Sequence, residues 1–187
     1  MNDGRILVSG LSKDDLIFVF DRRGNLLGHI GEIVKFEDSP SWALNAGSIV
    51  VDDQDNIYYV FRFLLTPTVR KYTPEGKLLA EWHPESALLN RTIEQAKKTY
   101  EANKEKGATG RMQVLTAGAF DTETKTLWVA SGPQVMQLDS SGKVIRNFEL
   151  FLPETGPPLQ AEGLLVDRDF IRAATPLHGT FEFLKPH

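Results

Sequence analysis

The sequence predicts an all-β protein built from a repeated hairpin unit. Three stretches share one pattern: an apolar residue, then Asp or Thr, two spacers, Gly, a polar residue and two aliphatic residues. They are residues 19–27 (VFDRRGNLL), 71–79 (KYTPEGKLL) and 137–145 (QLDSSGKVI). This pattern is typical of a strand, a tight turn whose Gly takes a positive φ, and a returning strand. Because one hairpin cannot bury its own apolar face, the repetition predicts an array of stacked units.

A second pattern supplies two more strands to each unit. It consists of a short apolar strand ending in Asp, a polar turn and a strand rich in large apolar residues. It occurs at residues 48–60, 117–130 and 163–174. The recurrence of Asp52, Asp121 and Asp167 favours a structural role in the turn, because a catalytic site needs unlike groups that converge.

Joined together, the two patterns describe a four-stranded antiparallel unit whose strands are named a, b, c and d in chain order. Two units are complete, at about residues 48–82 and 117–148. Residues 4–30 supply b, c and d, and residues 163–184 supply a, b and c. Four-stranded antiparallel units in series are the blades of a β-propeller. The prediction is therefore one β-propeller-type domain over residues 1–187, with an incomplete ring of three and a half to four blades.

Residues 52–60 (DDQDNIYYV) followed by residues 69–79 (VRKYTPEGKLL) carry a family resemblance. This combination resembles the NHL-repeat class and related six-bladed β-propellers. The resemblance implies a fold and leaves the function open, since such propellers serve as binding scaffolds and as unrelated enzymes. A six-bladed ring needs more blades than this sequence holds. That favours a truncated chain, a gene fragment or a partial ring completed by another chain over a genuine four-bladed ring.

The longest link between units predicts a helical insertion at about residues 84–106. One apolar stripe has helical spacing and consists of Leu89, Ile93, Ala96 and Tyr100. Pro84 suits the first turn of a helix, and Gly107 suits its C-terminal stop. Glu94 and Lys98 are predicted to form an i, i+4 ion pair.

Composition excludes several classes of protein. The net charge is −4, with no basic stripe, which argues against nucleic-acid binding. No apolar run approaches the ~20 residues of a membrane-spanning helix. There is no cysteine, so disulfides, thiolate catalysis and sulfur-ligated metals are excluded. The first residues, MNDGRI, lack the pattern of a secretory signal, so we expect a cytoplasmic protein or a processed extracytoplasmic one.

Strand order predicts which face carries function. In an up-and-down blade the a–b and c–d turns share one edge, while the b–c loops and the links between blades share the other. Here all the long links belong to the second edge, which we call the loop-rich face. Because binding residues concentrate on loops held by a rigid scaffold, we expect a site there, near the mouth of the ring.

Five residues are candidate ligand-binding residues on that face: Trp42, Arg62, Phe63, Glu162 and His178. Each has a structural alternative. Arg62 could bind an anion or, like Arg70, form a surface ion pair. Trp42 could stack on a ligand or pack in the core, as expected for Trp82 and Trp128. Glu162 could point into the channel mouth or into solvent, and His178 could be a ligand or base or simply a solvated loop residue.

Phe63 belongs to an apolar loop, residues 61–67 (FRFLLTP). The structural interpretation is that Phe63, Leu64 and Leu65 pack under the helical insertion against Leu89 and Ile93. The functional alternative is an exposed apolar patch that binds a partner.

The sequence contains no motif that carries catalytic chemistry. The four histidines form no metal-binding pair, and the nucleophile-elbow, phosphate-loop and dinucleotide motifs are absent. No catalytic residue, metal ligand or cofactor is therefore predicted, which favours a non-catalytic protein.

The leading hypothesis is a module that binds a protein or a small molecule on its loop-rich face, without nucleic acid or membrane. One alternative, implied by the resemblance, is a hydrolase or lyase that uses a divalent cation. Another is an assembly unit completed by self-association into a homo-oligomer, because open strand edges recruit other strands.

Overall fold

The computed structural model describes residues 1–187 except 11–13, 37–40, 107–111, 153–155, 177, 178 and 187, and the side chains of Ser41 and Trp42. It holds four separate antiparallel sheets. Sheet 1 contains β1 (Ile6–Ser9), β2 (Asp15–Phe20) and β3 (Leu26–Glu32). Sheet 2 contains β4 (Gly47–Val51), β5 (Ile57–Phe61), β6 (Val69–Tyr72) and β7 (Leu78–Trp82). Sheet 3 contains β8 (Ala117–Asp121), β9 (Thr126–Ser131), β10 (Gln134–Leu138) and β11 (Val144–Glu149). Sheet 4 contains β12 (Gly163–Val166), β13 (Phe170–Thr175) and β14 (Gly179–Leu184).

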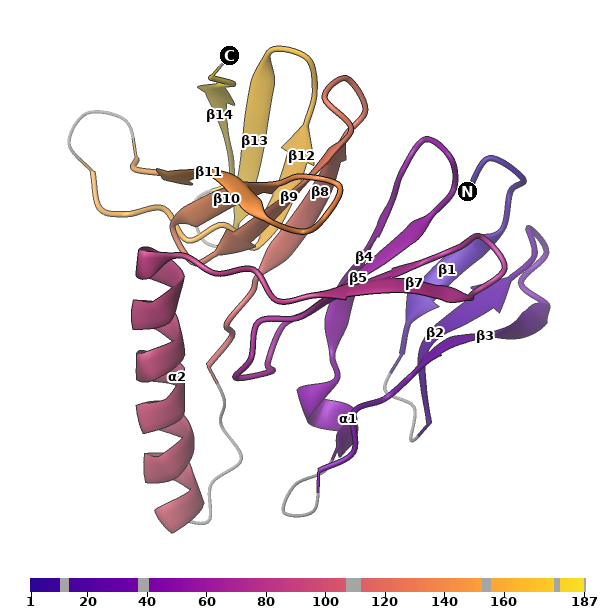
Figure 1. Cartoon of the computed structure of the whole chain (residues 1–187), viewed down its shortest axis with the longest axis horizontal. Coiled ribbons are helices and arrows are strands. Elements are labelled where there is room, and N and C mark those ends of the chain that lie inside the picture. The colour runs from indigo at the N-terminus through magenta and orange to yellow at the C-terminus, as the bar shows by residue number, and fades with distance from the viewer. Residues whose placement is uncertain (11–13, 37–40, 107–111, 153–155, 177–178, 187) are drawn as a thin grey trace.

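The four sheets are the blades of an incomplete β-propeller with one helical insertion, as predicted (Figure 1). Within each sheet the strands pair in chain order. Sheets 2 and 3 are complete blades, sheet 1 supplies strands b, c and d, and sheet 4 supplies a, b and c. Contacts between β1 and β4, β4 and β8, and β8 and β12 join each sheet to the next. The inner strands therefore follow one another across the molecule in the same order as in the chain.

The aspartates that end strand a are structural, as predicted. One carboxylate oxygen of each accepts hydrogen bonds from two backbone amides of its own turn: Gln54 and Asn56 for Asp52, Glu123 and Thr124 for Asp121, Asp169 and Phe170 for Asp167. The c–d turns repeat this arrangement at Asp21, Thr73 and Asp139. The recurrent polar residues of both sequence patterns thus fix the turns of the blades.

Glycines in the c–d turns have the positive φ that the pattern predicts, and two of them also allow the sheets to pack closely. φ is +90° at Gly76 and +83° at Gly142. A Cβ atom at Gly76 would lie 2.8 Å from Cγ1 of Ile30 in the preceding sheet. A Cβ atom at Gly142 would lie 2.1 Å from Cγ of Trp82, again in the preceding sheet. The turn glycine of one blade therefore contacts the last residues of strand d in the blade before it.

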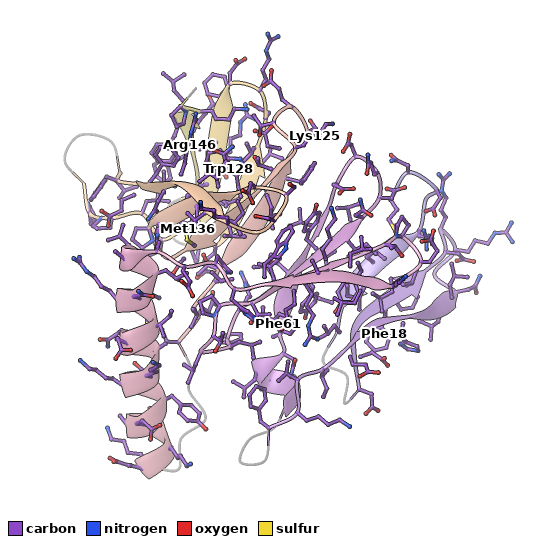
Figure 2. All side chains as sticks on the ribbon, viewed as in Figure 1. Phe18, Phe61, Lys125, Trp128, Met136 and Arg146 are labelled. Atoms are coloured by element: carbon purple, nitrogen blue, oxygen red, sulfur yellow. The ribbon has the colours of Figure 1, made fainter. Side chains whose placement is uncertain are left out.

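Three apolar clusters fill the spaces between successive sheets. Ile17, Val19 and Ile30 of sheet 1 pack with Tyr59, Phe61 and Tyr72 of sheet 2. Val60, Val69 and Trp82 of sheet 2 pack with Val129, Met136 and Leu138 of sheet 3. Ala117, Trp128 and Val135 of sheet 3 pack with Ile171, Ala173 and Phe183 of sheet 4. Figure 2 shows Phe61, Trp128 and Met136 among these side chains. The expectation that Trp82 and Trp128 belong to the core is confirmed, since both are buried.

The predicted helical insertion is α2 (Ala87–Glu105), and a short helix α1 (Ser41–Leu44) precedes β4. Leu89 and Ala96 of the predicted stripe are buried against the core between sheets 2 and 3. Two details of the prediction were wrong. Pro84 lies before the helix, because the N-cap is Ser86, whose hydroxyl accepts from the amide of Leu89.

The ion pair of Glu94 is also different from the one predicted. Glu94 Oε1 lies 3.0 Å from Nζ of Lys97, one residue before Lys98, because residues at i, i+3 are neighbours on a helix as well. The predicted stop at Gly107 lies outside the described residues. None of the helices described here has both the length and the apolar composition that crossing a membrane requires.

The turn aspartates predict acid sensitivity. Side-chain hydrogen bonds from Asn25 and Ser141, assisted by backbone amides, lower the pKa of Asp21 and of Asp139 respectively. A carboxyl group whose pKa is lowered by folding stabilises the protein above its unfolded pKa, and this contribution is lost as the pH falls through the folded pKa. The urea midpoint, followed by tryptophan fluorescence, should therefore drop below about pH 4. An Asp21→Asn, Asp139→Asn double variant should show a shallower drop, and an unchanged pH profile would contradict this assignment.

Candidate functional site

A largely apolar cavity of about 410 Å³ lies on the loop-rich face. It is bounded by the β5–β6 loop, by strands β6 and β7, by α1 with the segment before it, and by α2 with the segment after it. Its apolar walls include Phe36, Phe63, Leu65, Tyr100 and Met112. The cavity does not reach the inner strands β4, β8 or β12 among the residues that line it. It therefore lies toward the outer strands, away from the mouth of the ring where we expected a site.

The β5–β6 loop is held in place at its base and at its tip. The amide of Arg62 donates to the carbonyl of Ala46, and the amide of Phe61 donates to the carbonyl of Thr68. The Thr68 hydroxyl donates to the carbonyl of Thr66 at 2.8 Å. These hydrogen bonds pair polar backbone groups of a partly buried loop and hold its apolar side chains in fixed positions.

The apolar residues of this loop divide between two cores. Leu65 packs on the cluster that contains Leu89 and Ile93, as the structural interpretation predicts. Leu64 and Phe63 instead pack on the cluster between sheets 1 and 2. The prediction was therefore right for Leu65 and wrong for the other two, because the loop runs along the boundary between the two cores.

One wall of the cavity carries a short chain of polar side chains. Arg70 Nε lies 2.5 Å from Oε2 of Glu81, its partner across β6 and β7. Arg70 Nη1 donates to the carbonyl of Glu32 at 2.7 Å, and the guanidinium lies 5.1 Å from the centre of the Phe61 ring. Burial is the largest single effect on the pKa of Arg70 and lowers it, but the interactions with Glu81 and Tyr72 together outweigh burial and raise the pKa. Arg70 is thus a charged residue committed to protein partners, in the ion pair that the sequence indicated.

His83 is the most exposed of these polar side chains, with 47% accessible against 36% for Glu81. Its Nε2 lies 3.4 Å from Oε1 of Glu81, and its Nδ1 lies 3.2 Å from the carbonyl oxygen of Pro67. Nδ1 also lies 3.4 Å from Oγ1 of Thr68. Thr68, His83 and Glu81 therefore follow one another in the order of a nucleophile, a base and an acid.

Two observations argue against nucleophilic chemistry at these three residues. The Thr68 side chain belongs to a residue only 3% exposed, and its hydroxyl already donates to Thr66. Both contacts of the relay are 3.4 Å, longer than the 2.6–3.2 Å that such a relay uses. The arrangement serves to fix the His83 ring at the rim of the cavity.

Arg62 makes contacts that neither alternative considered for it included. Its Nε and Nη2 donate to the carbonyl of Thr116 at 2.9 and 2.7 Å, and Nη2 also lies 3.3 Å from the carbonyl oxygen of Glu162. Thr116 precedes β8 and Glu162 precedes β12, so one side chain from the β5–β6 loop connects sheets 2, 3 and 4. The acceptors are carbonyl oxygens, where the sequence suggested an anion or a carboxylate.

Of the other candidate residues, the structure describes the side chains of Phe63 and Glu162, and these two lie in different places. The Glu162 side chain is exposed, while its backbone meets Arg62. Phe63 lines the apolar cavity. Trp42 is the second residue of α1, but its side chain lies outside the described part of the structure, and so does all of His178.

Sequence reasoning had named the apolar loop with Phe63, Leu64 and Leu65, the helical stripe with Ala96 and Tyr100, and Arg70, which all line the cavity. It missed the other half of the wall: Val34, Phe36, Leu44, Thr68, Glu81, His83 and Met112. Val34, Phe36, Leu44 and Met112 come from links whose path the sequence pattern does not define, while Thr68, Glu81 and His83 lie in or beside strands β6 and β7. In the described part of the chain no group of three or more His, Asp or Glu side chains is placed to hold a metal ion.

Comparison with known proteins identifies the fold and no family. No protein-family model matches the sequence, and no curated protein matches it. Among solved structures, a protein of unknown function from Bacteroides caccae aligns with 93% of this chain at a TM-score of 0.58 and 16% identity. The chain spans about half of that protein, 53% of its length. The computationally designed Ika4 protein aligns with 97% of this chain and 85% of its own, at a TM-score of 0.51 and 12% identity.

A lower similarity links the chain to virginiamycin B lyase from Staphylococcus aureus. The alignment covers all of this chain and 50% of the lyase, at a TM-score of 0.47 and 11% identity. Similarities at these identities describe the arrangement of the sheets and carry no information on activity.

Proposed function

We propose that this chain is a non-catalytic binding module that takes a small, largely apolar molecule in the cavity between the β5–β6 loop and α2. The observation that carries the proposal is the cavity itself, with about 410 Å³ of space and mostly hydrocarbon walls. Ligand pockets typically measure about 300–1,000 Å³ and combine apolar walls with few polar groups. The site also lies on the loop-rich face, where the sequence places function.

The polar groups of the cavity support a ligand that is apolar over most of its surface. Arg70 Nε and Nη1 donate to Glu81 and to the Glu32 carbonyl, and the Thr68 hydroxyl donates to Thr66. His83 and Glu81 are the more exposed of these side chains, at 47% and 36%. A ligand with an apolar body and one hydrogen-bonding group near His83 would match this distribution, because each buried polar atom of a ligand needs a partner.

A fluorescent neutral probe, N-phenyl-1-naphthylamine, tests the proposal. We expect its fluorescence to rise on binding to the wild-type chain. Leu65→Gln and Tyr100→Gln, which put amides into the wall, should each weaken binding tenfold or more, because an unpaired buried amide costs about 1–3 kcal/mol. The matched control is Ile145→Gln, a similar change on β11 at a residue that is 48% exposed and outside the cavity.

The control variant should bind the probe as the wild type does. Circular dichroism of each variant establishes that the fold is retained. Equal binding by wild type, cavity variants and control would contradict the proposal, and so would no binding by the wild type.

A further inference from the structure

We propose that copies of this chain associate head to tail, with sheet 4 of one copy packed on sheet 1 of the next. The proposal does not depend on the cavity. It starts from the two ends of the row of sheets in Figure 1. Sheets 2 and 3 are covered on both faces, whereas sheets 1 and 4 are each covered on one face within the described structure.

All the interfaces inside the chain are of one kind. We call the face of a sheet that meets the preceding sheet its leading face, and the face that meets the following sheet its trailing face. In sheet 2, Tyr59 and Tyr72 are on the leading face, while Val60 and Val69 are on the trailing face. Each of the three interfaces joins a trailing face to a leading face. Sheet 1 therefore exposes a leading face and sheet 4 exposes a trailing face. A trailing face packed on a leading face is the contact that occurs three times within the chain.

The open leading face of sheet 1 is mostly apolar, with His29 beside Phe18 as its polar member among the residues of these pairs. Strand pairing puts Ile6 beside Phe20 and Val8 beside Phe18, on the side of the sheet opposite Ile17 and Val19. Ile6 is 48% exposed and Val8 is 44% exposed. Figure 2 shows Phe18 on this sheet.

The repeat shows what such positions do when they are covered. Phe20 immediately precedes its turn residue, as Tyr72 and Leu138 precede theirs, and Tyr72 and Leu138 are buried between sheets. Gly24 corresponds in the same way to Gly76 and Gly142, which touch the sheet before them. A Cβ atom at Gly24 would meet nothing within 4 Å. Sheet 1 thus has the residues of an inter-blade contact without the neighbouring blade.

The open trailing face of sheet 4 carries Leu165 and Leu184, which are 56% and 79% exposed. Leu165 lies two residues before Asp167, as Val50 and Ala119 precede Asp52 and Asp121. Val50 and Ala119 are both buried against the next sheet. Arg172 lies on the same open face beside Leu165 and pairs with Glu182 at 2.8 Å, which satisfies its charge locally.

A second copy is the occupant that continues the existing interface. A head-to-tail contact joins a trailing face to a leading face, whereas contact between two copies of sheet 1 would join two leading faces. Head-to-tail interfaces close into rings when the rotation allows it. This chain spans 53% of the similar Bacteroides caccae structure, so two copies together are slightly larger than that structure. We therefore expect a closed pair.

The test is light scattering coupled to gel filtration over a wide concentration range. The wild type should show twice the 20.9 kDa mass of the chain. Val8→Glu on the leading face and Leu165→Glu on the trailing face should each raise the dissociation constant at least tenfold. Ile145→Glu is the control, a change at an exposed residue of sheet 3 that should leave the mass unchanged. Circular dichroism checks that each variant is folded, which we expect because all three positions are exposed.

Mixing the two variants identifies the orientation. In a head-to-tail pair, the intact trailing face of the Val8→Glu chain meets the intact leading face of the Leu165→Glu chain, so the mixture should regain a pair with one interface. If sheet 1 met sheet 1, Leu165→Glu alone would still pair. Three outcomes would overturn the proposal. The wild type could stay monomeric at every concentration, each single variant could still pair, or the mixture of the two variants could fail to pair.

Discussion

Replacing Gly142 by alanine is expected to lower the free energy of unfolding by about 2–5 kcal/mol. Two effects add. The residue has a φ of +83°, which costs an L-amino acid about 1–2 kcal/mol. The new methyl group would also lie 2.1 Å from Cγ of Trp82, so the indole must move out of the core between sheets 2 and 3. Urea unfolding followed by circular dichroism measures the change.

Gly24→Ala is the matched control for this prediction. Gly24 occupies the equivalent turn position with the same φ of +83°, but a Cβ atom there meets nothing within 4 Å. At a concentration where the chain is monomeric, we expect only the backbone cost, about 1–2 kcal/mol. The difference between the two variants then isolates the contact with Trp82. Equal losses would show that the turn glycine does not set the spacing between blades.

Replacing Lys185 by methionine is expected to lower the free energy of unfolding by about 3–5 kcal/mol. Lys185 Nζ lies 3.0 Å from Oδ2 of Asp121 and donates to the carbonyl of Asp167, also at 3.0 Å. The side chains of Lys185 and Asp121 are only 4% and 1% exposed. Methionine keeps the volume but leaves the Asp121 carboxylate buried without its cation. Lys185 connects sheets 3 and 4, and these sheets separate when the chain unfolds. The free energy of unfolding measured in urea should therefore include the whole loss.

Two further variants separate the buried charge from packing. Asp121→Asn added to Lys185→Met removes the unpaired charge, so the double variant should regain most of the lost stability. Lys125→Met is the control at an exposed pair, where Nζ lies 2.5 Å from Asp53 and the side chains are 58% and 40% exposed. Exposed pairs are screened by water, so no measurable change is expected. A double variant as unstable as Lys185→Met alone would show that the loss comes from packing.

The turns of this fold could be predicted from the sequence because the interactions that fix them are local. An Asp or Thr bonds to amides two to four residues ahead, and a glycine takes the φ that other residues avoid, so both leave a signature of fixed spacing. The stripe of α2 was visible for the same reason. Its start was placed too early, because the cap at Ser86 depends on one hydroxyl that competes with the usual preference of Pro84 for a first turn.

From the sequence, the loop-rich face could be predicted to carry the candidate site, but the residues that form the cavity could be predicted only in part. Phe63 was named and lines the cavity, but the interpretation of Arg62 as a ligand-binding or ion-pairing residue missed its real partners, the carbonyls of Thr116 and Glu162. Those partners are 54 and 100 residues away in the chain. Backbone carbonyls exist at every position, so nothing in a sequence marks which of them an arginine will reach.

The blades, their order and the edge at which the long links gather could be predicted from the residues, because these features follow from turn chemistry and from the alternation of apolar residues along each strand. The folded chain alone reveals where the space between links becomes a cavity, which polar side chains donate to other parts of the protein, and which sheet faces stay uncovered. These properties depend on the packing of segments that are distant in the chain, and such packing produces no periodic pattern in the sequence.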